Sequence, residues 1–589
     1  MEFFALCRDV VSTVRWLPLT LEIIGSYLCG KNRELWETTI KELRQLQQLQ
    51  DSQESLELPQ IGVREILKIV YSALKVEQKK IFLDIASLFV GSDARIVSCM
   101  FDTSDFNLVL GIEELIFMSL MKIGDSHELK MHDEVRDFGR SIVREGHCKE
   151  PDNGSRLWDY EEALKMLEGN EEGANIRGLS LDKGNSRQTV DLDSSYEITD
   201  YTSEQFKNLV SLRFLSVSDA NFVGDFDKIF SKLRWLRWER CPENLTVENF
   251  AVEELAVLDL SRSMISERWE GWKLIKSAVK LKVLNLTGCG SLENTFFLSG
   301  FKHIEILILR NCNKLKEIFS SIGMLETLVS LDLSGCLSLK KLPPEVGSLK
   351  GLKELFLDQT GIREIPDSIW SLVKLQRLSL QSCDQLRLNR DSIVKLESLT
   401  EMVLTKSKIT KLPESIEKLQ NLGILNTSKT DIERLPDAIG RLRKLQELDA
   451  SGCRNLSEVT LSICNLSSLQ SLDLRKCHEL QELPELPSSL RVVSVTCKSA
   501  KLPSFSHLSH LKQLRLHNCK SLVSIPELPS TTLELEILGC KALKFLNPQV
   551  AVEDTKASLK RLDIIRCESL GKLDLSQLIF SVYYMLWVA

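Results

Sequence analysis

From about residue 205 onward, apolar and polar residues alternate in one recurring pattern, LxxLxLxx followed by Cys, Thr or Ser. Apolar residues at positions i and i+2 lie on one face of a β-strand, and the residue between them faces the opposite way. Successive copies are 23 or 24 residues apart. The pattern therefore predicts one short strand per copy, stacked in chain order. The best aligned copies are centred on Leu284, Leu307, Leu331, Leu355, Leu378, Met402, Leu425, Leu448 and Leu472.

The second half of many copies reads LPxxIxxL, as in LPESIEKL from Leu412 and LPDAIGRL from Leu435. Proline fixes φ and has no N–H donor, which suits the start of a short helical or irregular segment. Narrow strands on one side and wider segments on the other bend the stack. The period and pattern are those of a leucine-rich repeat. We predict an α/β leucine-rich-repeat solenoid, a horseshoe with parallel strands on its concave face, over residues 205–575.

The residues between the two strand leucines form the predicted binding face of this solenoid. Exposed apolar side chains are better contact candidates than solvated ones, so Ile308, Phe356 and Val403 are candidate contact residues, together with Arg515. Asp or Asn occupies most of the other positions. This acidic row has two interpretations, recognition of a basic ligand or a contribution to repeat geometry and solubility, and we favour the second.

Ten of the 16 cysteines share one position of the repeat, five residues after the first strand leucine. Thr360, Ser407 and Thr430 take that position in other copies. A small side chain that is buried and hydrogen-bonds the turning backbone suits this inward bend. We interpret these cysteines as reduced structural residues, not as disulfides or metal ligands. They are Cys241, Cys289, Cys312, Cys336, Cys383, Cys453, Cys477, Cys519, Cys540 and Cys567.

Residues 1–150 show helical periodicity instead. Pro18 begins a predicted helix that Gly30 ends, a second helix carries Trp36, Ile40 and Leu43, and the Gln-rich stretch 45–53 is interpreted as a linker. Helices near 66–74, 79–91 and 112–120, a hairpin through Leu129 and Met131, and a helix from Asp133 follow in a winged-helix arrangement. The predicted domains are a helical remnant (1–50), a winged-helix-like module (55–150), a connector (151–204), the solenoid (205–575) and an apolar tail (576–589).

The charge and the hydrophobic runs of the chain argue against a nucleic-acid partner and a membrane span. The chain of 589 residues has 75 basic and 82 acidic side chains, a net charge of −7, so a nucleic-acid partner is not expected. No apolar run reaches the roughly 20 residues that span a bilayer, and the first residues lack signal-peptide features. We expect a protein of the cytoplasm, with the nucleus as a second location.

Four segments carry a family resemblance: WLPLTLEIIGSYLCGKNRELWETTIKELR, LKIVYSALKVEQKKIFLDIASLFVG, LKMHDEVRDFGRSIVRE and SRLWDYEEALKML. Followed by repeats of the form LDLSGCxxLxxLP, they resemble the plant nucleotide-binding leucine-rich-repeat immune receptors, in the class with an N-terminal Toll/interleukin-receptor-like domain. The resemblance covers nearly the whole chain. Nothing corresponds to the family's signalling domain or phosphate loop, so we expect an N-terminal truncation.

The resemblance also implies site residues. In this family a proline lies against the adenine of ADP and a histidine contacts the β-phosphate, which here are Pro18 and His132, the latter within the switch motif Met131-His132-Asp133. Trp16 replaces the family's glycine near Pro18. Without a phosphate loop, stable binding of ADP or ATP is not expected. Pro18 is also a usual first helical residue, and Asp133 an ordinary N-cap.

The family resemblance implies a disease resistance receptor or a fragment of one, whose repeats recognise a pathogen effector or a modified host protein, with a full-length receptor as a further partner. The alternative is a stand-alone repeat scaffold or decoy without nucleotide switching. No enzyme activity, catalytic residue or metal site is predicted.

Two segments imitate nucleotide sites, GSYLCGKN from Gly25 and the apolar run that ends at Asp84. In the first, Asn32 replaces the hydroxyl residue that would meet Mg²⁺. The second has an amphipathic context. We interpret both segments as helical.

Overall fold

The computed structural model describes residues 3–14, 18–51, 63–100, 108–124, 127–146, 156–169, 175–182, 198–387, 396–544 and 560–570. The chain forms two compact units: unit 1 is Met1–Leu260 with Glu270–Leu284, and unit 2 is Ser261–Trp269 with Asn285–Ala589. The predicted tail, 576–589, and Trp16 lie outside the described residues. None of the described helices has the length and apolar character needed to cross a bilayer.

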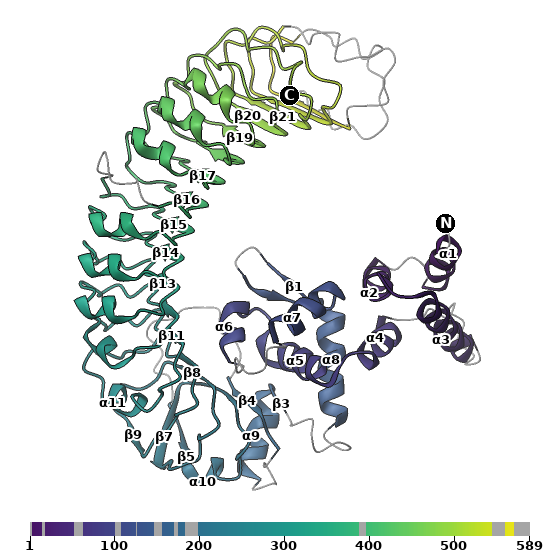
Figure 1. The fold of residues 1–589 in the computed structure, drawn as a ribbon, viewed down its shortest axis with the longest axis vertical. Coiled ribbons are helices and arrows are strands. Elements are labelled where there is room, and N and C mark those ends of the chain that lie inside the picture. Colours follow the sequence, from purple (N-terminus) through teal and green to yellow (C-terminus); the bar gives the residue numbers. More distant parts are fainter. Residues whose placement is uncertain are drawn as a thin grey trace. The chain divides into compact units, whose positions relative to one another are not determined.

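Unit 1 begins with three helices (Figure 1), α1 (Phe4–Thr13), α2 (Pro18–Leu28) and α3 (Arg33–Asp51). Pro18 begins α2 as predicted, and Gly30 follows that helix with φ +70°. The linker predicted at 45–53 is wrong as far as Asp51, because α3 continues through it. The Gln and Leu residues of this stretch are good helix formers, so the helix continues to Asp51.

The next part of unit 1 has the predicted winged-helix composition. The antiparallel hairpin pairs Ile123 with Leu129, and the run 79–91 is helical, with a π-helical turn at its end. Gly139 allows the last helix to approach this turn closely, since a Cβ there would lie 2.7 Å from the Ala86 Cβ. The elements are α4 (Val63–Ser72), α5 (Val76–Asp84), η1 (Ile85–Phe89), α6 (Ala94–Cys99), α7 (Leu108–Phe117), β1 (Lys122–Ile123), β2 (Leu129–Lys130) and α8 (Asp133–Gly146).

The first repeats also belong to unit 1. A parallel sheet runs through β3, β4, β6, β8 and β10, and Gly178 of β4 pairs with Phe214 of β6. The sheet therefore starts inside the segment predicted as a connector, 151–204. A second parallel sheet contains β5, β7 and β9. The elements are β3 (Arg156–Leu157), α9 (Tyr160–Glu168), β4 (Gly178–Leu181), β5 (Thr199–Thr202), α10 (Ser203–Phe206), β6 (Phe214–Ser218), β7 (Ala220–Asp225), β8 (Trp235–Glu239), β9 (Thr246–Glu248), β10 (Val257–Asp259) and α11 (Gly271–Ile275).

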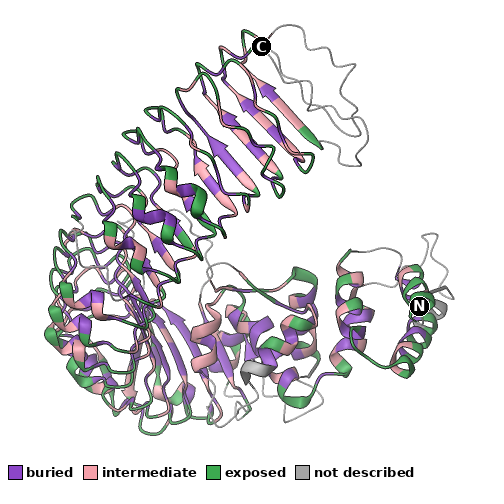
Figure 2. Ribbon diagram, turned by 45° about the horizontal axis from the view of Figure 1, so that its top comes forward, coloured by how far each residue is buried: buried purple, intermediate pink, exposed green. Residues whose placement is uncertain are grey.

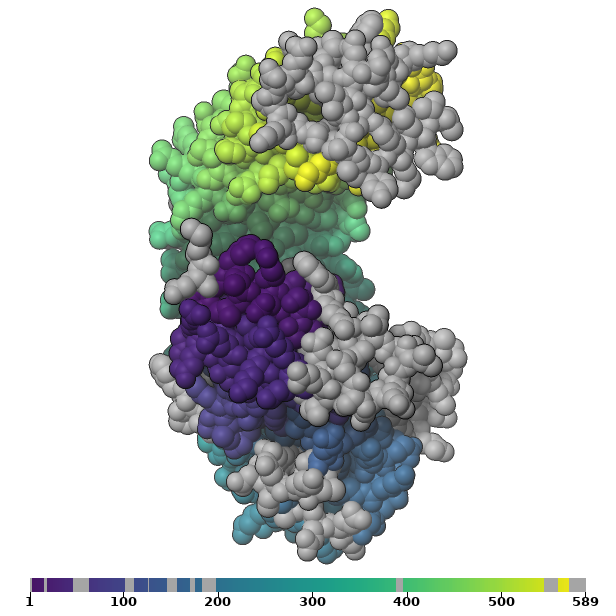
Figure 3. All heavy atoms as spheres, turned by 90° about the vertical axis from the view of Figure 1, so that its right-hand side faces the viewer, coloured from purple at the N-terminus to yellow at the C-terminus, as the bar shows by residue number. Residues whose placement is uncertain are grey.

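Unit 2 holds the remaining repeats of the predicted solenoid. Strands β12 to β23 pair in parallel, each with the next, and the register places equivalent leucines opposite each other, as in Leu307, Leu331 and Leu355. These leucines are fully buried, and buried residues run along the strands in Figure 2. The strands line the inner side of an arc and short 3₁₀ helices its outer side, so within this unit the horseshoe prediction is confirmed (Figure 1). Figure 3 shows the repeats stacked in chain order.

The strands of the repeat array from residue 283 onward are β11 (Val283–Asn285), β12 (Ile306–Ile308), β13 (Ser330–Asp332), β14 (Glu354–Phe356), β15 (Arg377–Ser379), β16 (Glu401–Val403), β17 (Ile424–Asn426), β18 (Glu447–Asp449), β19 (Ser471–Leu474), β20 (Val492–Val495), β21 (Gln513–His517), β22 (Glu534–Leu538) and β23 (Arg561–Ile565). The 3₁₀ helices are η2 (Phe296–Gly300), η3 (Ser320–Met324), η4 (Pro344–Ser348), η5 (Asp367–Ser371), η7 (Glu414–Lys418), η8 (Asp437–Arg441) and η9 (Leu461–Asn465).

Candidate functional site

The concave strand face of unit 2 carries the predicted contact residues. Ile308, Phe356 and Val403 are each partly exposed, while the residues on either side of them, leucines except for Met402, are buried in the core. They lie on the alternate strands β12, β14 and β16. Because neighbouring strands are about 4.8 Å apart, these apolar groups recur about every 10 Å along the face.

Two of the four candidates have partners within the chain. The guanidinium of Arg377, on the neighbouring strand, lies 5.6 Å from the ring centroid of Phe356, a cation–π distance. The Arg515 guanidinium lies 3.4 Å from a carboxylate oxygen of Glu536 and donates to Gln513 at 3.1 Å. Arg515 is therefore partly neutralised, whereas Ile308 and Val403 present apolar surface.

The acidic and amide row on this face has a structural role. The side-chain oxygen of each of four residues accepts a hydrogen bond from the backbone N–H two positions later, at 2.8–3.0 Å. This contact fixes the turn that leaves the strand, as Asx turns do. The favoured interpretation, a contribution to repeat geometry, is thus confirmed for these four. They are Asp332, Asn426, Asp449 and Asp473.

Most charges on the face are neutralised within it. Arg377 lies between two carboxylates, with its Nε 2.8 Å from Glu401 and its Nη1 3.7 Å from Glu354. Hydrogen bonding to Asp473 raises the pKa of Arg475. A partner that docks here therefore meets polar groups that are already paired, and its new contacts are the apolar ones.

The shared cysteine position forms a ladder through the core, which we call the thiol ladder. Nine of its ten cysteines are buried, and the thiols of Cys312, Cys336 and Cys383 donate to a carbonyl of the preceding repeat at 3.1–3.2 Å. Ser407, in the same position, donates to the Leu380 carbonyl at 2.6 Å. Burial raises the pKa of Cys477 to about 12, so its thiol keeps the proton that it donates. The predicted structural role is confirmed for these residues.

The switch motif lies where β2 leads into α8. His132 is the N-cap of this helix: its carbonyl accepts from Arg136 at 2.9 Å, and its Nδ1 accepts from the Glu134 N–H at 3.2 Å. Asp133 is the first helical residue and forms an ion pair with Arg136 at 2.8 Å. The prediction of Asp133 as N-cap is wrong, because the His132 ring nitrogen takes that place. Met131 is partly exposed, and His132 and Asp133 are exposed.

The remaining nucleotide-like residues lie on helices. Pro18 is the exposed first residue of α2. In the Gly25 segment the Cys29 N–H is bonded to the Gly25 carbonyl at 3.0 Å, so this backbone is helical and does not cradle a phosphate. Asp84 is the last residue of α5 and forms an ion pair with Arg156. The helical interpretation is therefore confirmed for both segments that resemble nucleotide sites.

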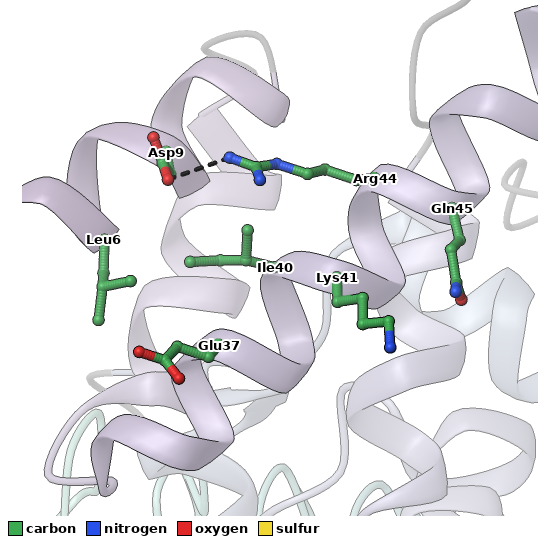
Figure 4. A pocket seen from close by; sticks show the side chains of 7 residues that line it. All are labelled: Leu6, Asp9, Glu37, Ile40, Lys41, Arg44 and Gln45. Atoms are coloured by element: carbon green, nitrogen blue, oxygen red, sulfur yellow. Dashed lines mark hydrogen bonds and ion pairs between the residues drawn. The ribbon is translucent and has the colours of Figure 1, made fainter.

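A surface cavity of about 510 Å³ lies between α1 and α3 (Figure 4). Its walls include Leu6, Ile40 and the ion pair between Asp9 and Arg44, which are 3.0 Å apart. Pro18 and His132 do not line it. Within the described residues, no group of three or more His, Cys, Asp or Glu side chains is arranged to hold a metal ion.

Sequence reasoning missed a buried junction in unit 1 between the winged-helix module and the first repeats. The Arg156 Nε donates to the Asp84 carboxylate at 2.5 Å, and the two side chains are 1% and 6% exposed. Beside them the fully buried Phe89 ring lies 5.0 Å from Phe214 and 4.9 Å from Trp235. A charged residue inside an otherwise apolar run, such as Asp84, was the one sequence signal of such a contact.

Comparisons with known proteins agree with this architecture. The family model described as a leucine-rich repeat region matches residues 280–407 and 387–578, which together are just over half of the chain. The model described as the winged-helix domain of Disease resistance protein Roq1-like proteins matches residues 75–147. Among solved structures, a leucine-rich-repeat protein of Leptospira interrogans aligns with a TM-score of 0.47 and 22% identity over 62% of this chain and 88% of that one.

The curated proteins similar to this chain include plant resistance proteins. TMV resistance protein N of Nicotiana glutinosa is 27% identical over 85% of this chain and 48% of its own length. Disease resistance protein RPV1 of Vitis rotundifolia is 30% identical over 54% of this chain and 23% of its own length. Disease resistance protein RPS4B of Arabidopsis thaliana is 28% identical over 85% of this chain and 36% of its own length. The chain thus spans about half the length of these relatives or less.

Proposed function

This chain belongs to the leucine-rich-repeat family, and from that premise we propose that it is the sensing part of a plant disease resistance receptor. Its repeats bind a protein ligand, either a pathogen effector or a host protein that an effector modifies. The observation that carries the proposal is the order of parts: a stretch matching the winged-helix domain of Roq1-like disease resistance proteins precedes the repeats, and TMV resistance protein N aligns over 85% of this chain.

The concave face of unit 2 supports a protein ligand. Its charges and turn-capping groups are paired within the chain, whereas Ile308 and Val403 are partly exposed apolar residues with no such pairing to lose. Apolar contacts surrounded by satisfied polar groups are typical of the residues that dominate binding energy in protein interfaces. Phe356 adds a partly exposed aromatic ring, which the Arg377 guanidinium faces at 5.6 Å.

The unit 1 junction supports transmission from repeats to switch. The Asp84–Arg156 pair and the Phe89 cluster join the winged-helix module to β3, β6 and β8 through buried contacts. Through these buried contacts, a ligand that favours one arrangement of the first repeats also favours one arrangement of the module.

His132 is the residue through which a nucleotide would contact this module. Because its Nδ1 accepts a backbone hydrogen bond, the proton of the neutral ring is on Nε2, which suits donation to a phosphate oxygen near the start of α8. Bound ADP would supply the negative charge that this donor and the helix start recognise. Pro18 would contact the adenine. One histidine and one proline do not make a phosphate cradle, so we propose that this chain does not retain ADP stably.

The test compares two triple variants of the full chain expressed in leaves and cross-linked during infection. One carries Ile308→Ser, Phe356→Ser and Val403→Ser on the concave face. The control carries Met324→Ser, Leu337→Ser and Leu461→Ser, which are 67%, 61% and 79% exposed. We expect the first variant to lose a pathogen or host protein that the parent and the control both capture. Equal capture by both variants would refute the proposed face.

Nucleotide retention is measured separately, by chromatography of the denatured purified protein. We expect no stoichiometric ADP. If ADP is found at one molecule per chain, the His132→Ala variant decides whether this histidine holds it. If His132→Ala loses both the nucleotide and the captured protein, the result would favour a nucleotide-dependent switch over the alternative of a stand-alone repeat scaffold.

A further inference from the structure

One column of residues along the edge of the repeats has an unusual backbone conformation. In each of these repeats the residue just before the thiol-ladder position has a φ between 53° and 77°. Glycine adopts this conformation readily, whereas a side chain makes it unfavourable. In unit 2 this edge column comprises Arg262, Gly288, Asn311, Gly335, Gln359, Ser382, Lys406, Lys429, Gly452, Lys476, Asn518, Gly539 and Arg566.

Three lysines are concentrated in four successive repeats of this column. Lys406, Lys429 and Lys476 follow β16, β17 and β19, and Gly452 follows β18 between them. All three lysines are exposed, and in the described part of the chain none of them has an ion-pair partner. Three lysines of the column therefore have a backbone conformation that glycine adopts at a lower free energy. Within the described residues no ion pair offsets this difference.

The three lysines lie along one line. The Lys406 N–H bonds to the Ser428 carbonyl at 2.8 Å and the Lys429 N–H to the Ser451 carbonyl at 2.7 Å, which keeps successive repeats in register at this edge. A Cβ at Gly452 would lie 3.0 Å from the Lys429 Cγ, so the Lys429 side chain extends over Gly452 along the column.

Unit 1 shows what a cation in this column binds. Asp219 and Arg240 occupy the same turn position in consecutive repeats, with φ 51° and 52°. Their side chains form a bidentate pair, with Arg240 Nη2 2.6 Å from Asp219 Oδ2. A cation at this edge thus reaches a carboxylate located one repeat away. Beside the three lysines of unit 2 the column holds Ser382 and Gly452, which offer no carboxylate.

We infer that the edge formed by Lys406, Lys429 and Lys476 is a docking site for an acidic segment of a partner protein. The partner's carboxylates take the place that Asp219 has beside Arg240. A long polyanion such as nucleic acid fits less well, because it would extend beyond this edge over a chain whose net charge is −7. The edge is distinct from the concave apolar contacts, and the inference stands or falls independently of the immune-receptor proposal.

The experiment uses the full chain and a fluorescein-labelled dodecapeptide of glutamate and serine, with a glutamine and serine peptide as probe control. Anisotropy gives the Kd at low and at high ionic strength, and differential scanning calorimetry gives the Tm. The test variant replaces Lys406, Lys429 and Lys476 with Gly. The matched control replaces Lys340, Lys374 and Lys411 with Gly, three exposed lysines that do not have positive φ.

We expect the test variant to bind the glutamate peptide about tenfold more weakly than the parent at low salt, as three exposed ion pairs predict. Its Tm should equal or exceed that of the parent, because glycine relieves the left-handed conformation. The control should keep the parent's Kd. A lower Tm with unchanged binding would overturn the inference and make the lysines structural. Equal loss of binding in both variants, or binding of the glutamine peptide as tightly as the glutamate peptide, would also overturn it.

Discussion

The buried ion pair between Asp84 and Arg156 allows a sharp test of the unit 1 junction. Asp84→Asn keeps the shape of the side chain and removes the carboxylate charge that lies against the buried Arg156 guanidinium. Arg156 is 1% exposed, so water does not replace the lost carboxylate. Removal of one partner from a buried pair costs about 3–5 kcal/mol.

The double variant separates this contact from general damage. Replacing Asp84 with Leu and Arg156 with Met removes both charges and keeps the volume, which is often about neutral for a buried pair. We therefore expect each single variant to be much less stable than the double variant. The exposed pair of Arg33 and Glu37, with side chains 61% and 53% exposed, is the control, and its loss should cost less than about 0.5 kcal/mol.

Native-state hydrogen exchange measures the loss of stability at the unit 1 junction itself. A cost of about 3–5 kcal/mol corresponds to exchange faster by roughly 10²–10³-fold or more, at about 1.4 kcal/mol for each factor of ten. We expect this increase in peptides from α5, η1, β6 and β8, with no change in peptides from unit 2. Exchange that rises less than tenfold in Asp84→Asn, or a double variant as unstable as the sum of the single variants, would refute the reasoning.

Three further predictions concern single positions. Gly139→Ala should lower the stability of unit 1 by about 1–3 kcal/mol, because the new methyl group meets the Ala86 Cβ at 2.7 Å; Gly25→Ala, which meets nothing within 4 Å, is the control, and both are compared by thermal melting. His132→Ala should cost about 1 kcal/mol through loss of the α8 cap, while His132→Asn should retain most of it, and similar melting of the two would contradict the capping role. Folding raises the pKa of Cys477 from 9.0 to about 12, so its share of stability is full below about pH 9 and is lost as the pH rises towards 12, by up to about 1.4 kcal/mol per pH unit. Urea unfolding at pH 8 and near pH 10.5 should show a smaller decrease for Cys477→Ser, because serine does not ionise; an equal decrease in both proteins would assign the pH dependence to other groups.

The repeat architecture was predictable because its signals are local. A period of 23 or 24 residues, leucines at i and i+2, and a proline before the outer segment occur within each copy, so no long-range contact is needed to recognise them. The N-terminal helices were predictable for the same reason, from Pro18 at one helix start and Gly30 at its end. The family resemblance supplied Pro18 and His132 as nucleotide contacts, and these assignments stay predictions.

The sequence by itself determined the repeats, the buried thiol ladder and the order of the two modules, because each is written in the spacing of neighbouring residues. Tertiary structure alone decided which polar groups are already paired. Three features depend on backbone dihedrals that composition does not specify. They are the helix start that His132 caps, the turns whose backbone N–H groups bond to the acidic row, and the lysines of the edge column. The contact between Asp84 and Arg156 joins residues 72 positions apart, and a pairing across that distance is fixed by the packing of the first repeats against η1. Spacing along the chain carries no record of it.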